Sequence, residues 1–375
     1  MATRQTDEPM TLHPLQGDGR IQAVAPEWRA LAQDASDPNP FMEFDFVEAQ
    51  LPAAAAKTPI YLLTAGEPKP WTGAIAVKLA QRFCDIPARH VTTAQLSENG
   101  LSTPLVRNGE ERTFARTLLN WLDDTPNNIL FLHLRQQLAD ATALRALAEA
   151  CLEDGRMFEI TASSHRPMLN LANPPAKANT PYQTRIEENW RSLMAQHAVA
   201  YTDHNTNTDI RERIEDFLEL EHAGWSGALA QSHLSCPDRL MSFRKLMNSL
   251  HRQNRLYWRQ LKANGAPIAM AIDITAGGRA YAFATAENPE FSQFAPQWLL
   301  AAKSPIQANS QLPVHTFIGG VGHSYTHLAE TWPDRQHVVD LFIGKKGALG
   351  GAAARAFLAV NAAHGRIQPL AGQYF

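Results

Sequence analysis

The sequence predicts an α/β fold built as two domains, and two observations support this. Short apolar runs typical of strands alternate with longer segments of helical spacing along the chain. The order of the predicted elements (helix, strand, hairpin, strand, helix) occurs in the first half and again in the second. A length of 375 residues fits two domains of ordinary size, and one large mixed α/β domain is the alternative.

The first domain is expected over residues 21–175, after a polar and loose tail at residues 1–20. Apolar runs bounded by turn residues predict its strands, and the first two are expected to form an antiparallel hairpin. The strands are expected at residues 59–64, 71–78, 128–134 and 157–161, and the helices at residues 26–35, 44–50, 114–122 and 141–152.

The second domain is expected over residues 185–375, after a linker. Residues 171–184 carry three prolines, which disfavour regular structure and mark the linker. The helices of this domain are expected at residues 185–196, 210–223 and 352–363, and its strands around residues 199–202, 256–261, 281–285 and 337–342.

Composition and charge argue against several classes of protein. A formal net charge of −3 and a pI near 6.5 provide no bulk attraction to nucleic acid. The cysteines form no Cys-x-x-Cys pair, so neither a metal knuckle nor a disulfide framework is expected. Residues 1–8 lack the apolar core of a signal peptide, and no apolar run reaches the ~20 residues of a membrane span. We therefore expect a cytoplasmic protein with no integral membrane segment.

The most informative segment is residues 216–227, Asp-Phe-Leu-Glu-Leu-Glu-His-Ala-Gly-Trp-Ser-Gly. It is typical of a helix end, with Gly224 expected as a left-handed stop. Trp225 follows between two glycines, which would let the backbone approach another group closely. An acidic residue, Glu221, beside this turn indicates the edge of a site. The alternative is a plain helix cap with Trp225 in the core.

Residues 220–227 resemble a signature of the GNAT-type acyltransferases of cellulose and exopolysaccharide biosynthesis, the CelD/BcsL-like group. That signature is Leu-Glu-x-x-Gly-Trp-Lys-Gly, so Ser226 stands where the family has lysine. The resemblance continues through residues 243–300 and is weaker in the first half, at residues 28–31, 39–41 and 103–122. It implies tandem GNAT-like domains, each a mixed, largely antiparallel sheet flanked by helices.

The same resemblance implies an acyltransferase that moves an acyl group, expected to be acetyl, from CoA to an amine or a sugar hydroxyl. The acceptor would be a small molecule or a glycan precursor in exopolysaccharide or envelope biosynthesis. Such an enzyme needs backbone N–H donors for the CoA pyrophosphate and for the oxyanion. It also needs a base that takes a proton from the attacking group.

The first candidate cradle for the pyrophosphate is a turn between a strand and a helix, in the position of the family's pyrophosphate loop. The residues expected to contact acetyl-CoA there are Phe294, Ala295, Gln297 and Trp298. This turn has no glycine, and a plain helix start is the alternative.

The second candidate cradle is the glycine-rich segment at residues 343–351, which follows an apolar strand and precedes an Ala-rich helix. Lys345 and Lys346 would bind a phosphate or an anionic acceptor. The alternative is a solvated loop that packs a final helix.

Glu221, Glu287 and Asp340 are the acid–base candidates. Glu221 has the surroundings most typical of a site and would orient or deprotonate the acceptor, while Trp225 and Ser226 would contact it. Asp340 lies in an apolar strand, where a carboxylate needs a partner or its pKa rises. Glu287 ends a strand, and the alternative is a surface turn residue.

A polar, glycine-rich cluster lies at residues 319–327. His323 and His327 are four residues apart, but no third ligand has matching spacing, so no metal is expected. We expect a loop that faces the substrate, with His323 in contact with it and Tyr325 as a proton donor.

Two other functions stay open. One is the related Fem-like aminoacyl-transfer branch, which uses aminoacyl-tRNA on the same tandem fold. It should show a basic groove, and the mild acidity of this chain argues against it. The other is a non-catalytic scaffold or regulator, which Ser226 and the absence of glycine at position 297 favour.

Overall fold

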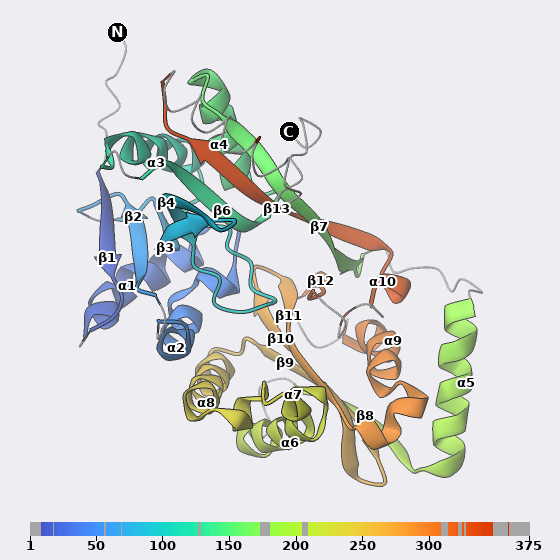
Figure 1. Ribbon diagram of the computed structural model, residues 1–375. Helices are drawn as coiled ribbons and strands as arrows, with labels where there is room; N and C mark the ends of the chain where they lie inside the picture. The colour runs from blue at the N-terminus through green and yellow to red at the C-terminus, as the bar shows by residue number, and fades with distance from the viewer. Residues whose placement is uncertain are drawn as a thin grey trace. The chain divides into compact units, whose positions relative to one another are not determined.

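The computed structural model describes residues 9–17, 19–55, 58–68, 70–126, 129–172, 181–204, 209–308, 314–321, 325, 328–347 and 359 (Figure 1). The chain divides into two compact units. The first comprises Met1–Ser164 together with His337–Phe375, and the second comprises His165–Gln336. The second unit therefore ends at Gln336, whereas the second domain was expected to cover residues 185–375. The reason is that strand β13 (Asp334–Gly344) pairs antiparallel with a strand of the first unit.

The first unit is a mixed sheet with helices on it. Its strand order is β1-β2-β3-β4-β6-β13-β7, with β5 on β3. The β4–β6 pair is parallel, and the pairs β1–β2, β2–β3, β3–β4 and β6–β13 are antiparallel. Besides β13, the strands are β1 (Met10–Pro14), β2 (Ile60–Ala65), β3 (Gly73–Phe83), β4 (Ile86–Thr93), β5 (Leu105–Val106), β6 (Phe131–Leu138) and β7 (Phe158–Asn170), which runs on into the second unit. The helices are α1 (Arg20–Gln33), the short 3₁₀ helix η1 (Pro40–Met42), α2 (Phe44–Ala55), α3 (Glu111–Asp124) and α4 (Thr142–Glu153).

Strand β1 corrects the expectation of a loose tail at residues 1–20 for Met10–Pro14, and residues 1–8 lie outside the described residues. Its residues pair antiparallel with β2, from Met10 opposite Ala65 to Pro14 opposite Tyr61. The polar composition of the tail did not predict this strand, because a strand at the edge of a sheet needs few apolar side chains.

The second unit has the strand order β7-β12-β11-β10-β9-β8, in which β11–β12 is parallel and the other pairs are antiparallel. Its remaining strands are β8 (Val199–His204), β9 (Leu256–Ala263), β10 (Ala266–Ala276), β11 (Arg279–Glu287) and β12 (Thr316–Ile318). Its helices are α5 (Pro181–Gln196), α6 (Ile210–Ala223), α7 (Trp225–Ala228), α8 (Pro237–Arg252), α9 (Pro296–Ala308) and α10 (Leu328–Thr331), with short 3₁₀ helices η2 (His233–Ser235) and η3 (Pro289–Phe294).

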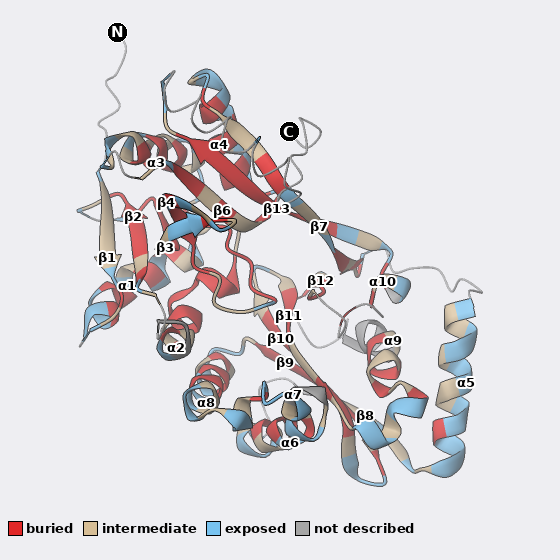
Figure 2. Ribbon diagram, in the orientation of Figure 1, coloured by how far each residue is buried: buried red, intermediate tan, exposed pale blue. Residues whose placement is uncertain are grey.

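Helices cover both faces of this second sheet. On one face, Trp258 of β9 packs edge-on against Phe217 of α6, with 6.2 Å between ring centres. On the other face, Leu261 of β9 clusters with Leu193 of α5 and Leu299 of α9. Figure 2 shows burial concentrated on the strands and on the inner sides of these helices. The alternation of side chains along β9 therefore builds two apolar layers. In the described part of the chain, none of the helices has the length and apolar character that crossing a bilayer requires.

Candidate active site

Glu221 lies in the last turn of α6 and forms a pair with His233. Its Oε2 accepts a hydrogen bond from the backbone N–H of His233 at 2.8 Å, and its two oxygens lie 3.0 and 2.8 Å from Nδ1 of that histidine. The Glu221 side chain is 11% exposed and the His233 side chain 23%. The imidazole packs on Phe243, with 4.4 Å between ring centres. With Nδ1 held by the carboxylate, Nε2 is the nitrogen that can take a proton from a substrate.

Side-chain hydroxyl groups hold the turn that carries His233. Nδ1 of His222 lies 3.0 Å from Oγ of Ser232, and that oxygen lies 2.7 Å from Oγ of Ser235. Ser232 is fully buried, and its carbonyl accepts the backbone N–H of Ser235 at 3.1 Å. These bonds fix η2 beside the end of α6, so the position of His233 does not depend on Glu221 alone.

Two glycines allow tight packing where α6 ends. A Cβ atom at Gly227 would lie 1.6 Å from the carbonyl oxygen of His222, and one at Gly224 would lie 3.1 Å from the carbonyl oxygen of Glu287. The structure therefore has the close approach expected at these glycines. The expected left-handed stop is wrong, because Gly224 has an extended backbone with φ −86° and ψ −163°. The packing of Gly224 puts the end of α6 beside the end of β11.

Strand β12 pairs with only the first part of β11. Their parallel register covers only Arg279–Tyr281 of β11. A register shift between Ile272 and Asp273 of β10 leaves Phe283 as an extra residue in β11, which is a β-bulge. Among the described strands, β12 pairs with β11 only up to Tyr281.

Side chains at the turn expected to bind the CoA pyrophosphate pack within the second unit. Phe294 is buried in the apolar cluster that contains Leu193 and Leu299. Trp298 lies against Tyr182, with 5.3 Å between ring centres, and the Arg185 guanidinium lies 5.5 Å from its ring centre. These contacts join α9 to α5, which is a structural role for both aromatic residues.

The backbone donors of the same turn are also engaged. The N–H groups of Trp298 and Leu299 both donate to the carbonyl of Ala295, at 2.9 and 3.2 Å. Burial raises the pKa of Glu287, and hydrogen bonding from the backbone of Gln297 offsets part of the rise. The first residue of α9 is proline, which has no N–H. The turn therefore offers few free backbone N–H groups, and its contact with acetyl-CoA stays a prediction.

Asp340 lies in the part of β13 that belongs to the first unit, whereas Glu221 lies in the second. Its Oδ1 accepts the backbone N–H of Gln136 at 2.8 Å, and its Oδ2 lies 3.4 Å from Nε of Arg135. Gln136 has a φ of +53° at an irregularity in the β6–β13 register. The expected partner for this carboxylate exists, and the contact stabilises a bulge; a catalytic role of Asp340 stays a prediction.

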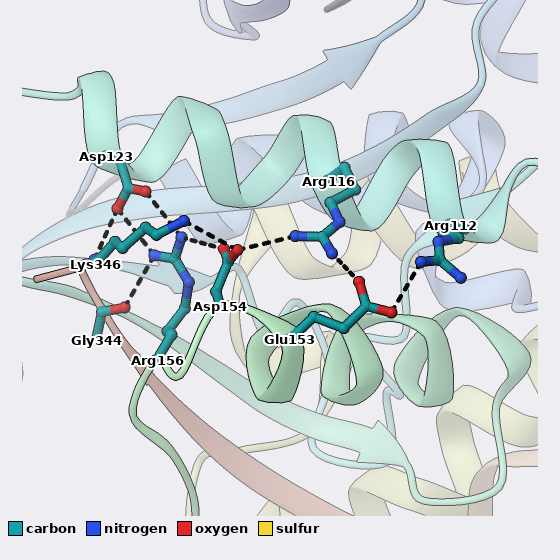
Figure 3. A network of polar contacts seen from close by, with 8 residues as sticks. All are labelled: Arg112, Arg116, Asp123, Glu153, Asp154, Arg156, Gly344 and Lys346. Carbon is teal, nitrogen blue, oxygen red and sulfur yellow. Dashed lines mark hydrogen bonds and ion pairs between the residues drawn. The ribbon is translucent and has the colours of Figure 1, made fainter. Parts of the chain in front are cut away.

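Lys345 and Lys346 also lie in the first unit, and their cationic groups have partners within the chain. Nζ of Lys345 donates to the carbonyl of Thr125 at 2.7 Å. Nζ of Lys346 lies 3.1 Å from Oδ1 of Asp154, and the backbone N–H of Lys346 donates to Asp123 at 2.9 Å (Figure 3). The two lysines connect the end of β13 to its own unit, and their binding of a phosphate stays a prediction. Residues 348–351 of that loop lie outside the described residues.

Tyr325, the expected proton donor, is buried in the second unit. It is 5% exposed and belongs to an apolar cluster with Phe317 and Trp332. Burial lowers the pKa of the Arg166 guanidinium to about 10, and the electrostatic interaction with Tyr325 raises that pKa by a smaller amount. Tyr325 thus fills the core, and its role as a proton donor stays a prediction.

The side chains of Trp225 and Ser226, and all of His323 and His327, lie outside the described residues. Substrate contacts by Trp225, Ser226 and His323 stay predictions. Within the described ranges, no three His, Cys, Asp or Glu side chains are grouped so that they could hold a metal ion.

His233 is the residue that sequence reasoning missed. It lies twelve residues after Glu221 in a Ser-His-Leu-Ser turn, and the one available signal was a histidine between two serines before a helix. Glu287, the third acid–base candidate, is half-buried at the end of β11, which differs from the alternative of a surface turn residue.

Residues 182–304 match the family model of the acetyltransferase (GNAT) domain. This region holds Glu221, His233 and Glu287, so the geometry above lies within the part of the chain that is similar to a GNAT-type acyltransferase domain. A comparison with the curated proteins finds no match.

Solved structures share the fold over most of the chain. A conserved protein of unknown function from Bacteroides thetaiotaomicron is 13% identical, with a TM-score of 0.56 and coverage of 86% of this chain and 97% of that one. FemX is 11% identical, with a TM-score of 0.52 and coverage of 85% and 95%. The C-terminal domain of a putative lysylphosphatidylglycerol synthetase from Agrobacterium fabrum is 11% identical, with a TM-score of 0.51 and coverage of 93% and 100%. The predicted α/β fold with a mixed sheet is thereby confirmed, and at these identities the likeness concerns the fold alone.

Proposed function

We propose that the second unit transfers an acyl group from an activated donor to an amine or hydroxyl acceptor, with His233 as the general base. The observation that carries this proposal is the Glu221–His233 pair, in which the carboxylate holds Nδ1 at 2.8 Å. The pair lies inside the region that matches the GNAT domain. A carboxylate that holds one imidazole nitrogen prepares the other to accept a proton.

In the proposed reaction, the acceptor's N–H or O–H proton passes to Nε2 of His233 as the acceptor's heteroatom bonds to the acyl carbon. The bond between the acyl carbon and the donor's sulfur or oxygen then breaks, and the leaving group takes up the proton that His233 releases. Glu221 touches no reacting atom. It orients the ring and stabilises the imidazolium, so it is a positioning residue.

Acetyl-CoA is the proposed donor, because the matching family model describes acetyltransferases. The proposed acceptor is an amine, or a sugar hydroxyl of an exopolysaccharide or envelope precursor, which follows the CelD/BcsL-like resemblance. The pyrophosphate of CoA would need donors other than the N–H groups of Trp298 and Leu299 at the start of α9, because both are bonded to the carbonyl of Ala295.

Aminoacyl transfer is the second candidate, and the same occupied start of α9 favours it. A donor in which an amino acid is esterified to a ribose does not need a CoA pyrophosphate at this helix. The fold shared with FemX is compatible with this candidate. A non-catalytic scaffold is the third candidate function, and in it the Glu221–His233 pair would have no role in catalysis.

The experiment measures release of free thiol from acetyl-CoA by the full chain, with a panel of amines and amino sugars. We expect His233→Gln to lower turnover by roughly 10²-fold or more, since general base catalysis is worth that much. Glu221→Gln should lower turnover by a smaller factor, because Glu221 acts only through the orientation of the His233 ring. His251→Gln, in the last turn of α8, is the matched control and should leave turnover unchanged.

Equal turnover of His233→Gln and the parent would refute His233 as the base. If the folded parent transfers nothing from acetyl-CoA but acylates an acceptor from an aminoacyl ester, the second candidate replaces the first. If the folded parent transfers nothing from either donor, the non-catalytic scaffold is the remaining candidate.

A further inference from the structure

A second histidine at the end of α6 contacts a pair of serines around η2. Nδ1 of His222 lies 3.0 Å from Oγ of Ser232, and that oxygen lies 2.7 Å from Oγ of Ser235. We propose that Ser235 is a nucleophile that carries the acyl group before it reaches the acceptor, and that His222 activates it through the hydroxyl of Ser232. This inference rests on the proposed function, because it adds a covalent step to that reaction.

The two hydroxyl groups differ in burial, and this assigns their roles. Ser232 is fully buried and lies between the imidazole and the second serine. A hydroxyl has one proton to donate and can accept another. When Ser232 donates its proton to Nδ1 of His222, its oxygen can accept the proton of Ser235. Ser235 is exposed, so it can meet an acyl donor, whereas Ser232 can only pass a proton along.

The distances suit the activation of a serine. A serine hydroxyl is a weak nucleophile until a base takes its proton, and this transfer needs hydrogen-bond distances of about 2.6–3.2 Å. Both contacts of Ser232 are within that range. His222 is exposed, so the imidazole that takes the proton is also in contact with solvent. A continuous hydrogen-bonded path thus joins an accessible base to an accessible hydroxyl.

Backbone contacts hold this path in place. The N–H of Ser235 donates to the carbonyl of Ser232 at 3.1 Å, which fixes the two serines relative to each other. A Cβ atom at Gly227 would lie 1.6 Å from the carbonyl oxygen of His222, so only glycine fits there and the segment after α6 packs directly on this histidine. The helix η2 also carries His233. The proposed nucleophile and the proposed base for the acceptor therefore lie two residues apart.

The reaction then has two halves. In the first, Oγ of Ser235 bonds to the acyl carbon, its proton passes to Ser232, and the proton of Ser232 passes to Nδ1 of His222. The bond between the acyl carbon and the donor's sulfur or oxygen breaks, and the leaving group takes up a proton from solvent. In the second, the acceptor's heteroatom bonds to the acyl carbon while His233 takes the acceptor's proton and releases it to solvent. The bond to Oγ of Ser235 breaks, and the proton on His222 returns to that oxygen through Ser232.

The test detects the acyl group on the protein, so it needs no acceptor. The full chain is mixed with acetyl-CoA, or with p-nitrophenyl acetate as an activated ester without CoA, and is quenched in acid. Mass spectrometry of the chain and of its peptides measures and locates the acetyl group. We expect it on Ser235 in the parent, and we expect no acetyl group in Ser235→Ala. Ser192→Ala is the matched control and should react like the parent, because Ser192 is an exposed serine of α5 whose hydroxyl pairs with Gln196.

A double variant separates proton transfer from a structural role of Ser232, which acts through Ser235 and is a positioning residue. Ser232→Ala should slow the acetylation of Ser235 by roughly 10²-fold, as the loss of general base catalysis does. Ser235→Cys places a thiol there, which ionises at about pH 8.5 without a base. Ser232→Ala combined with Ser235→Cys should therefore be acetylated at position 235 as fast as Ser235→Cys alone. If Ser232 only shaped the turn, its loss would slow both backgrounds equally.

Several results would overturn the proposal. They are an acetyl group on Cys236 alone, no acetyl group on the parent with either probe, and equal acetylation rates of the parent and Ser232→Ala. Acetylation of Ser192 at the rate of Ser235 would also overturn it, because the reaction would then be unselective. Circular dichroism of each variant checks that it is folded.

The outcomes for Ser235 and for the proposed function can be told apart. A parent that is acetylated on Ser235 but passes the acetyl group to no acceptor would keep this proposal and remove the proposed function. Acyl transfer that His233→Gln abolishes and Ser235→Ala leaves unchanged would do the reverse.

Discussion

Replacing Arg156 by methionine is expected to destabilise the first unit more than other single changes in the ion-pair network of Figure 3. The Arg156 side chain is fully buried, and its two terminal nitrogens each lie 2.8 Å from an oxygen of Asp123. One of them also lies 3.0 Å from Asp154, and the other donates to the carbonyl of Gly344 at 3.2 Å. This one guanidinium thus joins the end of α3, the α4–β7 turn and the end of β13.

The expected loss of unfolding free energy depends on how exposed each charged side chain is. Removing one partner of a buried ion pair costs about 3–5 kcal/mol, because the other charge stays buried without compensation. The Asp123 side chain is 26% exposed and water can partly solvate it, so we expect the lower end, about 3 kcal/mol of unfolding free energy. Lys346 and Arg112 are 57% and 66% exposed, and truncating either to alanine should cost less than about 1 kcal/mol.

Urea denaturation of the full chain, with hydrogen exchange of α3 and α4 as the local readout, measures this ranking. Acid adds a second test. Burial raises the pKa values of Asp123 and Asp154, but the hydrogen bonds from Arg156 outweigh it, so both are lowered. Their stabilisation is complete above pH of about 4 and is lost as the pH falls below it, so Arg156→Met should lose less stability in acid than the parent. An Arg156→Met cost below that of Lys346→Ala would refute this reasoning.

Two further predictions concern buried charge. Burial, and then the charges of His90 and Arg135, lower the pKa of His133 to about 3, so the first unit should lose about 1.4 kcal/mol per pH unit as the pH falls from 6.5 toward 3. His133→Phe should flatten that dependence in urea denaturation, and an unchanged slope would contradict it. In the second unit, Asp273→Asn should cost about 3–5 kcal/mol because Arg259, 2.8 Å away and equally buried, keeps its charge. The double change Arg259→Met with Asp273→Leu should cost much less, and equal losses in both variants would argue against the pair.

Local signals were sufficient to predict α6 with the bounds that the structure has, residues 210–223. The helix begins where the Asp209 side chain accepts the backbone N–H of Arg211 at 2.9 Å. Its buried side chains include Ile214, Phe217 and Leu218, which recur at helical spacing. Each of these signals lies within a few residues of its effect, which is why sequence alone reveals it.

The roles of Lys346 and Asp340 could not be predicted in the same way. The partner of the Lys346 ammonium, Asp154, is 192 residues away in sequence, and the partner of the Asp340 carboxylate, Gln136, is 204 residues away. A lysine in a glycine-rich loop has the same local pattern whether it binds a ligand or a distant aspartate. Only the pairing of β13 with β6, which no short motif encodes, decides between them.

The position of the proposed base depends on backbone packing as well as on its carboxylate partner. Glu221 holds Nδ1 of His233 at the end of α6, and Gly224 packs that end against the backbone of Glu287. A Cβ atom at position 224 would lie 3.1 Å from the carbonyl oxygen of Glu287, so a larger residue there would press the end of α6 away from β11. Glu221 lies in that last turn, so a change at Gly224 would also change how the carboxylate holds His233.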